Sequence, residues 1–159
     1  MAIPEHASAL DTARFDVANR LFFRLYQASN LMHKTGSRSV AEFGTTTQQW
    51  AVLGALSRPA VREAGMTVKA LIEFLLLSRQ NLTAVLNRLE RSDLIERVRI
   101  SEDGRVRRIR LTPRGAEVWR RMVVKIAAYY DSALAGFTTE EAYTLYRLLD
   151  RLKSRLVQL

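Results

Sequence analysis

The sequence contains no cysteine and only two histidines, His6 and His33. Without cysteine the chain has no disulfide, no thiolate metal ligand and no thiol that senses oxidants. No glycine-rich phosphate-binding loop and no cluster of metal ligands accompanies the two histidines, so no group of side chains suits acid–base or nucleophilic catalysis. We therefore expect no enzyme, no metal site and no cofactor.

Long apolar runs and acidic residues are also scarce. No stretch of about 18 apolar residues occurs, and the N-terminus lacks the basic and then apolar order of a secretion signal, so we expect a cytoplasmic protein without a membrane-spanning segment. Against 16 acidic residues stand 25 lysines and arginines, which give a net charge of +9. This excess favours a polyanionic partner, either nucleic acid or an acidic membrane surface.

Residues 77–91 predict an amphipathic helix. Ser78 is a suitable N-cap, because its hydroxyl can accept from backbone N–H groups of the first turn. Apolar residues follow at helical spacing: Leu82, Val85, Leu86 and Leu89. The opposite face has no carboxylate before Glu90, whereas a solvated face normally mixes both signs. This favours a DNA-recognition helix over an ordinary polar surface, and its candidate contacts are Arg79, Gln80, Asn81, Thr83, Asn87 and Arg88.

A second short helix is predicted directly upstream, over residues 68–75, with Thr67 as its cap. The two helices then meet at a turn of about three residues, Leu75 to Leu77, which is the helix-turn-helix arrangement. Leucine is disfavoured at positive φ. We therefore expect this turn to be built differently from one that contains glycine.

The alternation downstream predicts a β-hairpin, with strands over 95–100 and 108–111 and a polar turn in which Gly104 is available for positive φ. Between residues 97 and 114 seven arginines stand against two acids, Glu102 and Asp103, an imbalance that is repulsive unless an anion lies alongside. A hairpin beside a recognition helix is the wing of a winged helix-turn-helix. Arg105 at its tip can enter a minor groove.

Long helices are predicted on both sides of the winged region 46–112. Residues 10–35 form one helix whose apolar stripe is broader than a small domain needs, and residues 113–159 form two more with heptad-like apolar seams. We expect one chain, 1–159, that is mainly α with a small β-wing: a winged helix-turn-helix domain flanked by N- and C-terminal dimerisation helices. The alternative is a monomer in which these helices cap the winged domain of their own chain, because an apolar seam does not show which chain covers it.

Three motifs resemble the multiple antibiotic resistance regulator (MarR) family of dimeric bacterial transcription factors. They are the helix start T-T-T-Q-Q-W-A-V-L at residues 45–53, the segment L-S-R-x-x-L-T at 77–83, and the wing segment D-G-R at 103–105 that leads to R-L-T-P-R-G at 110–115. With the flanking helices the resemblance spans nearly the whole chain. It implies a ligand-responsive transcriptional regulator, expected to be a repressor, in which Asp103 and Gly104 shape the wing and Arg105 reads the minor groove.

Two recognition helices related by a two-fold axis can enter successive major grooves about 34 Å apart, so the operator is expected to be a near-palindrome with half-sites about 10 bp apart. Gln80, Asn81 and Thr83 are expected at base edges, with Arg79 and Asn87 or Arg88 nearer phosphates. Arginines of the wing either contact phosphate or lie on a solvated strand face. The candidate DNA-binding residues are Ser78, Arg79, Gln80, Asn81, Thr83, Asn87, Arg88, Arg105, Arg107 and Arg108.

The family resemblance also implies a small-molecule effector between the helical region and the winged domain, frequently an aromatic acid or phenolic compound. An aromatic carboxylate or its coenzyme A thioester is expected here. His33 and Arg38 can pair with a carboxylate while aromatic rings stack on its body. Each candidate also has a plainer role in a core, in an interface or in solvent. The candidates are Phe22, Phe23, Tyr26, Met32, His33, Arg38 and Trp50.

Two other classes of protein remain as alternatives. A sequence-tolerant architectural DNA-binding protein has the same charge, but it has no need of the base-reading group at residues 80, 81 and 83. A basic membrane-surface helix needs its arginines opposite an apolar face, whereas here they concentrate on a hairpin. Competition by a scrambled duplex separates the regulator from the architectural protein.

Overall fold

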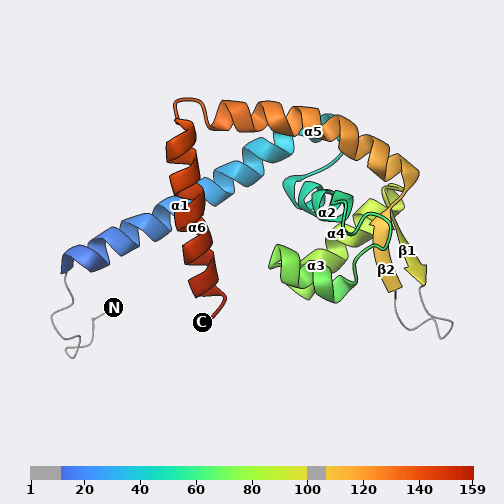
Figure 1. The fold of residues 1–159 in the computed structure, drawn as a ribbon, viewed down its shortest axis with the longest axis horizontal. Coiled ribbons are helices and arrows are strands. Elements are labelled where there is room, and N and C mark those ends of the chain that lie inside the picture. The colour runs from blue at the N-terminus through green and yellow to red at the C-terminus, as the bar shows by residue number, and fades with distance from the viewer. Residues whose placement is uncertain (1–11, 100–106) are drawn as a thin grey trace.

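The computed structural model describes residues 12–99 and 107–159 (Figure 1). The predictions for Asp103, Gly104 and Arg105 lie outside the described residues. Within these ranges the chain is mainly helical with a two-stranded antiparallel sheet, which confirms the predicted fold class. Its elements are α1 (Thr12–Ser39), a 3-10 helix η1 (Ala41–Phe43), α2 (Thr47–Ser57), α3 (Val68–Leu75), α4 (Arg79–Arg91), β1 (Ile95–Arg99), β2 (Arg107–Leu111), α5 (Pro113–Ala133) and α6 (Thr139–Leu156).

Polar residues start most of these helices, and the two predicted caps, Thr67 and Ser78, are among them. Thr67, Ser78 and Thr112 each accept a hydrogen bond from a backbone N–H of the first turn of α3, α4 and α5. Thr46 and Thr138 complete capping boxes, in which the side chain of a glutamine or glutamate returns a hydrogen bond to the cap. Local sequence therefore fixes where the helices around the wing begin.

Two expectations about the chain path are wrong. Helix α1 continues to Ser39 instead of ending near residue 35, and Gly36 within it packs so closely on α2 that an added Cβ would lie 2.6 Å from Thr47 Cγ2. The turn between α3 and α4 is also built with a left-handed residue, Leu76, at φ 54° and ψ 36°. The Leu76 side chain is 58% exposed, so the conformational cost of roughly 1–2 kcal/mol is not increased by a clash in the core.

The hydrophobic core lies in the winged region and its junction with α5. Helix α2 contacts α3, α4, α5 and β2, and its Leu53 and Leu56 are fully buried. Met66 pairs with Ile109 through an isolated antiparallel bridge, which holds the loop before α3 beside β2. The other largest fully buried side chains are Leu71, Leu82, Leu86, Leu89, Ile95, Ile109, Met122, Val40 and Val52.

Helices α1 and α6 contribute almost nothing to this core. Helix α1 buries only Gly36, and α6 buries no residue. Figure 1 shows both helices extending away from the winged region: α1 leads into it through η1 and α2, whereas α6 is joined to it through the long helix α5. Large apolar side chains on the two helices are exposed: Phe15, Val17, Leu21, Phe22, Phe23, Tyr26, Leu31, Met32, Tyr143, Leu145, Tyr146, Leu148, Leu149 and Leu156.

Candidate nucleic-acid interface

Helix α4 divides into a buried face and an exposed polar face, as expected for a recognition helix. Its buried residues are Leu82, Val85, Leu86 and Leu89, and they pack into the core around α2. The candidate contact residues of this helix and its cap are all exposed: Ser78, Arg79, Gln80, Asn81, Thr83, Asn87 and Arg88. The structure therefore gathers them on one solvent-facing surface.

The first turn of α4 has a chemistry that suits a polyanion. Ser78 Oγ accepts from the Asn81 N–H at 3.2 Å, and the turn carries no acidic residue. A helix N-terminus with free N–H groups and no carboxylate favours phosphate. Thr83 Oγ1 donates to the Arg79 carbonyl at 2.8 Å, so the hydroxyl proton is already used and the oxygen can only accept from a ligand. The methyl group of the same side chain is free to make an apolar contact.

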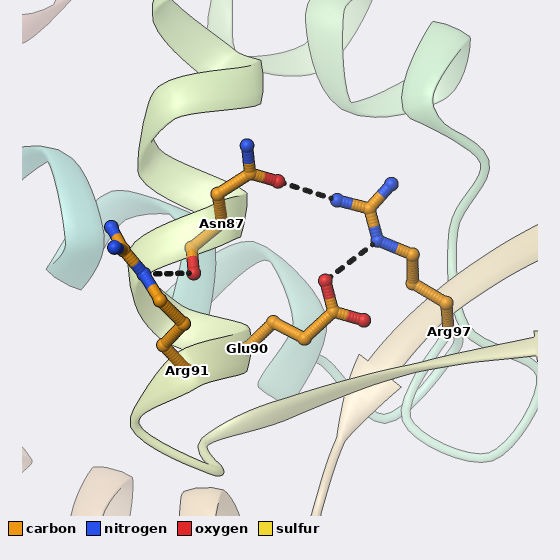
Figure 2. Close-up of polar contacts among 4 residues, drawn as sticks. All are labelled: Asn87, Glu90, Arg91 and Arg97. Atoms are coloured by element: carbon orange, nitrogen blue, oxygen red, sulfur yellow. Dashed lines mark hydrogen bonds and ion pairs between the residues drawn. The ribbon is translucent and has the colours of Figure 1, made fainter.

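Two arginines of the hairpin are paired with glutamates. Arg97 Nε donates to Glu90 Oε2 at 3.0 Å, and Arg110 Nε donates to Glu96 Oε1 at 2.7 Å. Both glutamates lie just before the window in which seven arginines were counted against two acids. The charge imbalance of the wing is therefore smaller than the sequence window indicated. Figure 2 shows that Arg97 also reaches Asn87 on α4.

Arg107 and Arg108 have different surroundings, although the sequence treated them alike. Arg108 Nη1 donates to the Gly65 carbonyl at 3.1 Å, and its Nε is buried without a hydrogen-bond partner among the described residues. Arg107 is exposed and lies directly opposite Arg99 in the sheet register. Like charges directly opposite are destabilising, so an anion beside the pair would relieve them. Arg99, which the sequence analysis did not single out, thereby joins the candidate surface.

The family follows from comparison with known proteins. A model of the MarR family matches residues 43–106. The transcriptional activatory protein BadR of Rhodopseudomonas palustris is 47% identical over 146 residues, which are 89% of this chain and 83% of that protein. The chain belongs to the MarR family.

Two further comparisons extend over most of this MarR-family chain. The homoprotocatechuate degradative operon repressor of Escherichia coli is 30% identical over 112 residues, 70% of this chain and 72% of that protein. The structure of the PcaV transcriptional regulator of Streptomyces coelicolor, in complex with its natural ligand, has a TM-score of 0.67 and 31% identity, and covers 97% of this chain and 98% of that one. This chain is a transcriptional regulator of the MarR type that binds DNA.

The predicted effector residues of this MarR-family regulator fall into separate places. Phe22 and Tyr26 line an open, largely apolar groove of about 870 Å³ between α1 and α6, which Leu76 and Leu149 also line. Phe23 lines a separate hollow on α1 itself. Met32 and Arg38 are exposed on α1. His33 and Trp50 belong instead to the junction of α1, α2 and α5.

Hydroxyl groups and aromatic rings meet at this junction. His33 Nδ1 lies 2.8 Å from Thr47 Oγ1, and Ser37 Oγ accepts from the Thr47 N–H at 3.1 Å. Thr35 Oγ1 lies 3.0 Å from the Tyr129 hydroxyl. These contacts tie the last turns of α1 to the first turn of α2 and to the far half of α5.

A cluster of three rings completes the junction. Trp50 meets Tyr129 edge-on, with ring centroids 6.0 Å apart, and lies tilted against Tyr130 at 5.7 Å. Burial raises the pKa of Tyr130, and the neighbouring Tyr129 adds to that rise. Sequence analysis missed the tyrosines as site residues, because Tyr130 fits equally well into the apolar seam of α5.

Two absences hold for the described residues. Between residues 12 and 99 and between 107 and 159, no helix is long and apolar enough to cross a bilayer. In the same part of the chain no group of three or more histidine, aspartate and glutamate side chains is arranged to hold a metal ion.

Replacing Arg107 or Arg108 with alanine is expected to have different effects. Arg107→Ala should weaken binding to any duplex and should reduce the slope of log affinity against log salt by about one phosphate contact per subunit, without loss of stability. Arg108→Ala should lower the free energy of unfolding by about 1 kcal/mol, because the Gly65 carbonyl loses its donor. Denaturant titration and salt-dependent DNA binding of both variants check this. Equal losses of affinity at unchanged stability would contradict it.

Proposed function

We propose that this regulator binds a near-palindromic operator as a homodimer and represses transcription until an aromatic acid or its coenzyme A thioester releases it. The observation that carries the proposal is the exposed face of α4, which is free of carboxylates before Glu90 and lies on the same domain as the exposed Arg99–Arg107 pair. We propose the cytoplasm as its location, because bacterial DNA lies there.

The exposed residues of α4 divide by chemistry into base readers and phosphate contacts. Gln80 and Asn81 can make bidentate contacts to adenine, each worth roughly 1–3 kcal/mol of discrimination, and the methyl group of Thr83 suits thymine. Arg79 and Arg88 are the phosphate contacts. Polar neutral residues in the first turns distinguish this surface from a sequence-tolerant one, which needs charge alone.

The dimer is supported by the uncovered helices. The 28 residues of α1 make a helix about 42 Å long at 1.5 Å per residue, yet almost none of it is buried by its own chain. Helices gain most of their stability from packing an apolar face. A second copy offers the same apolar faces, so residues 10–35 and 113–159 form the proposed dimerisation region, and residues 46–112 bind DNA.

The effector site is proposed at the junction of α1, α2 and α5. His33, which lies beside Thr47 at the start of α2, supplies a partner for a carboxylate, and Arg38 is an exposed cation further along α1 that could reach the same group. Trp50 and Tyr130 supply rings for an aromatic body. The name of the Escherichia coli relative, a homoprotocatechuate degradative operon repressor, supports an aromatic acid. Such a ligand releases DNA only if it binds the DNA-incompetent state more tightly.

Activation of transcription, instead of repression, is the second candidate for the effect of operator binding. The relative that is 47% identical carries the name of a transcriptional activatory protein, whereas the one that is 30% identical carries the name of a repressor. The same operator binding serves either outcome, because the sign depends on where the operator lies relative to a promoter. A reporter gene behind the selected operator separates the two.

Selection of bound duplexes from a random oligonucleotide pool tests the proposal, with and without a panel of aromatic acids and their coenzyme A thioesters. A palindromic consensus should emerge and should be lost with one member of the panel. Enrichment of no sequence, with binding that falls steeply with salt, would instead identify an architectural protein.

His33→Ala tests the effector site. The effector concentration for half-release of the operator should rise about tenfold, equivalent to about 1.4 kcal/mol, while operator affinity without effector stays unchanged. Arg24→Ala is the matched control, since Arg24 is exposed on the same helix and bonds only Gln27 among the described residues. Equal responses of both variants to the effector would refute the placement of the site.

A further inference from the structure

Arg97 connects the wing strand to the recognition helix. Its Nε donates to Glu90 Oε2 and its Nη2 donates to Asn87 Oδ1, each at 3.0 Å (Figure 2). We infer that Arg97 is a positioning residue for DNA recognition, which holds β1 against α4 and fixes the orientation of the Asn87 amide. The inference rests on the proposed sequence-specific DNA binding and deepens it.

The geometry requires an arginine. Asn87 and Glu90 are three residues apart, so they lie one turn apart on the same side of α4, and the guanidinium fork spans both acceptors at once. A lysine ammonium is a point charge on a flexible stem and does not reproduce this planar two-point contact. The Arg97 side chain is only 27% exposed, compared with 43% for Glu90, so the bonds are partly shielded from water.

The contact decides which atoms Asn87 offers to DNA. A guanidinium has donors only, so the atom of the Asn87 amide that faces Arg97 is the oxygen, and the NH₂ group is left to face elsewhere. A bidentate contact to adenine needs both amide atoms. Arg97 therefore takes one lone pair of the Asn87 oxygen, and the NH₂ donors that remain free suit the acceptors of guanine better than the donor and acceptor pair of adenine.

The same contact sets the position of the wing. Arg99 follows two residues after Arg97 and therefore lies on the same face of β1, opposite Arg107. On the other side of Asn87, Arg91 Nε donates to its backbone carbonyl at 3.2 Å (Figure 2). Asn87 thus joins the end of α4 to β1, the strand that carries Arg99 of the exposed arginine pair.

Arg97→Ala and Arg97→Lys, measured on the selected operator and on a scrambled duplex, test this role. Arg97→Ala should lower operator affinity about tenfold more than scrambled affinity, and base preference at the position facing Asn87 should relax because the amide is free to turn. Arg97→Lys keeps the charge but not the two-point contact. It should therefore retain the affinity for scrambled DNA and still lose base preference.

Arg110→Ala is the matched control. It removes an equal charge and an ion pair of the same hairpin, the pair with Glu96, in which both side chains are 42% exposed, but it breaks no hydrogen bond to α4. This variant should lose affinity equally on both duplexes. Dimer mass and helicity, measured on every variant, should stay unchanged.

The inference would be overturned if Arg97→Lys discriminated between the operator and the scrambled duplex as well as wild type does. It would also be overturned if Arg97→Ala and Arg110→Ala lost the same affinity on each duplex. Should Arg97→Ala not fold, Asn87→Ala replaces it, because that change leaves the bond to Glu90 intact. Adding Arg97→Lys to Asn87→Ala should cause no further loss of base preference, and additive losses would refute the role. Wild-type protein that binds both duplexes equally would refute the proposed function itself, and that result appears before any variant is compared.

Discussion

The uncovered apolar faces of α1 and α6 are the constraint on which the rest of the structure depends. The core is complete between Val40 and Ile126, whereas the two outer helices keep side chains such as Phe23, Tyr26 and Tyr146 in solvent. One chain therefore buries the core of its winged domain but leaves the apolar faces of its helical region exposed. If a second copy of the chain covers the helical region, the dimer presents two winged domains related by a two-fold axis, as a two-fold operator requires.

Helix α2 connects the two candidate sites physically. Its first turn meets His33, Ser37 and the tyrosine cluster, and its second half packs Leu53 and Leu56 into the core that α4 shares. A ligand beside its N-terminus thus acts on a helix that supports the recognition helix. Because close-packed cores shift as units, a small displacement of α2 would change the tilt of α4 and the separation of two such helices in a dimer.

Sequence alone predicted the helices, caps and strands that are determined by residues close to one another in the chain. The stripe of α4, the caps at Thr67 and Ser78 and the alternation of β1 and β2 depend on residues within a few positions. The partners of the wing arginines were not predictable, because Glu90 and Glu96 reach Arg97 and Arg110 only after the hairpin has packed. Thr35 and Tyr129 are 94 residues apart, so only the tertiary fold brings them together. Leu76 adopts a conformation that propensity disfavours.

Hydroxyl-radical footprinting of the wild-type protein on its selected operator tests the central claim most directly, namely that two copies of this domain read one two-fold site. The account predicts two symmetric protected patches whose centres are about 10 bp apart on the same face of the duplex, with weaker protection where the wings reach the minor groove. A single patch, or even protection along the whole duplex, would contradict it.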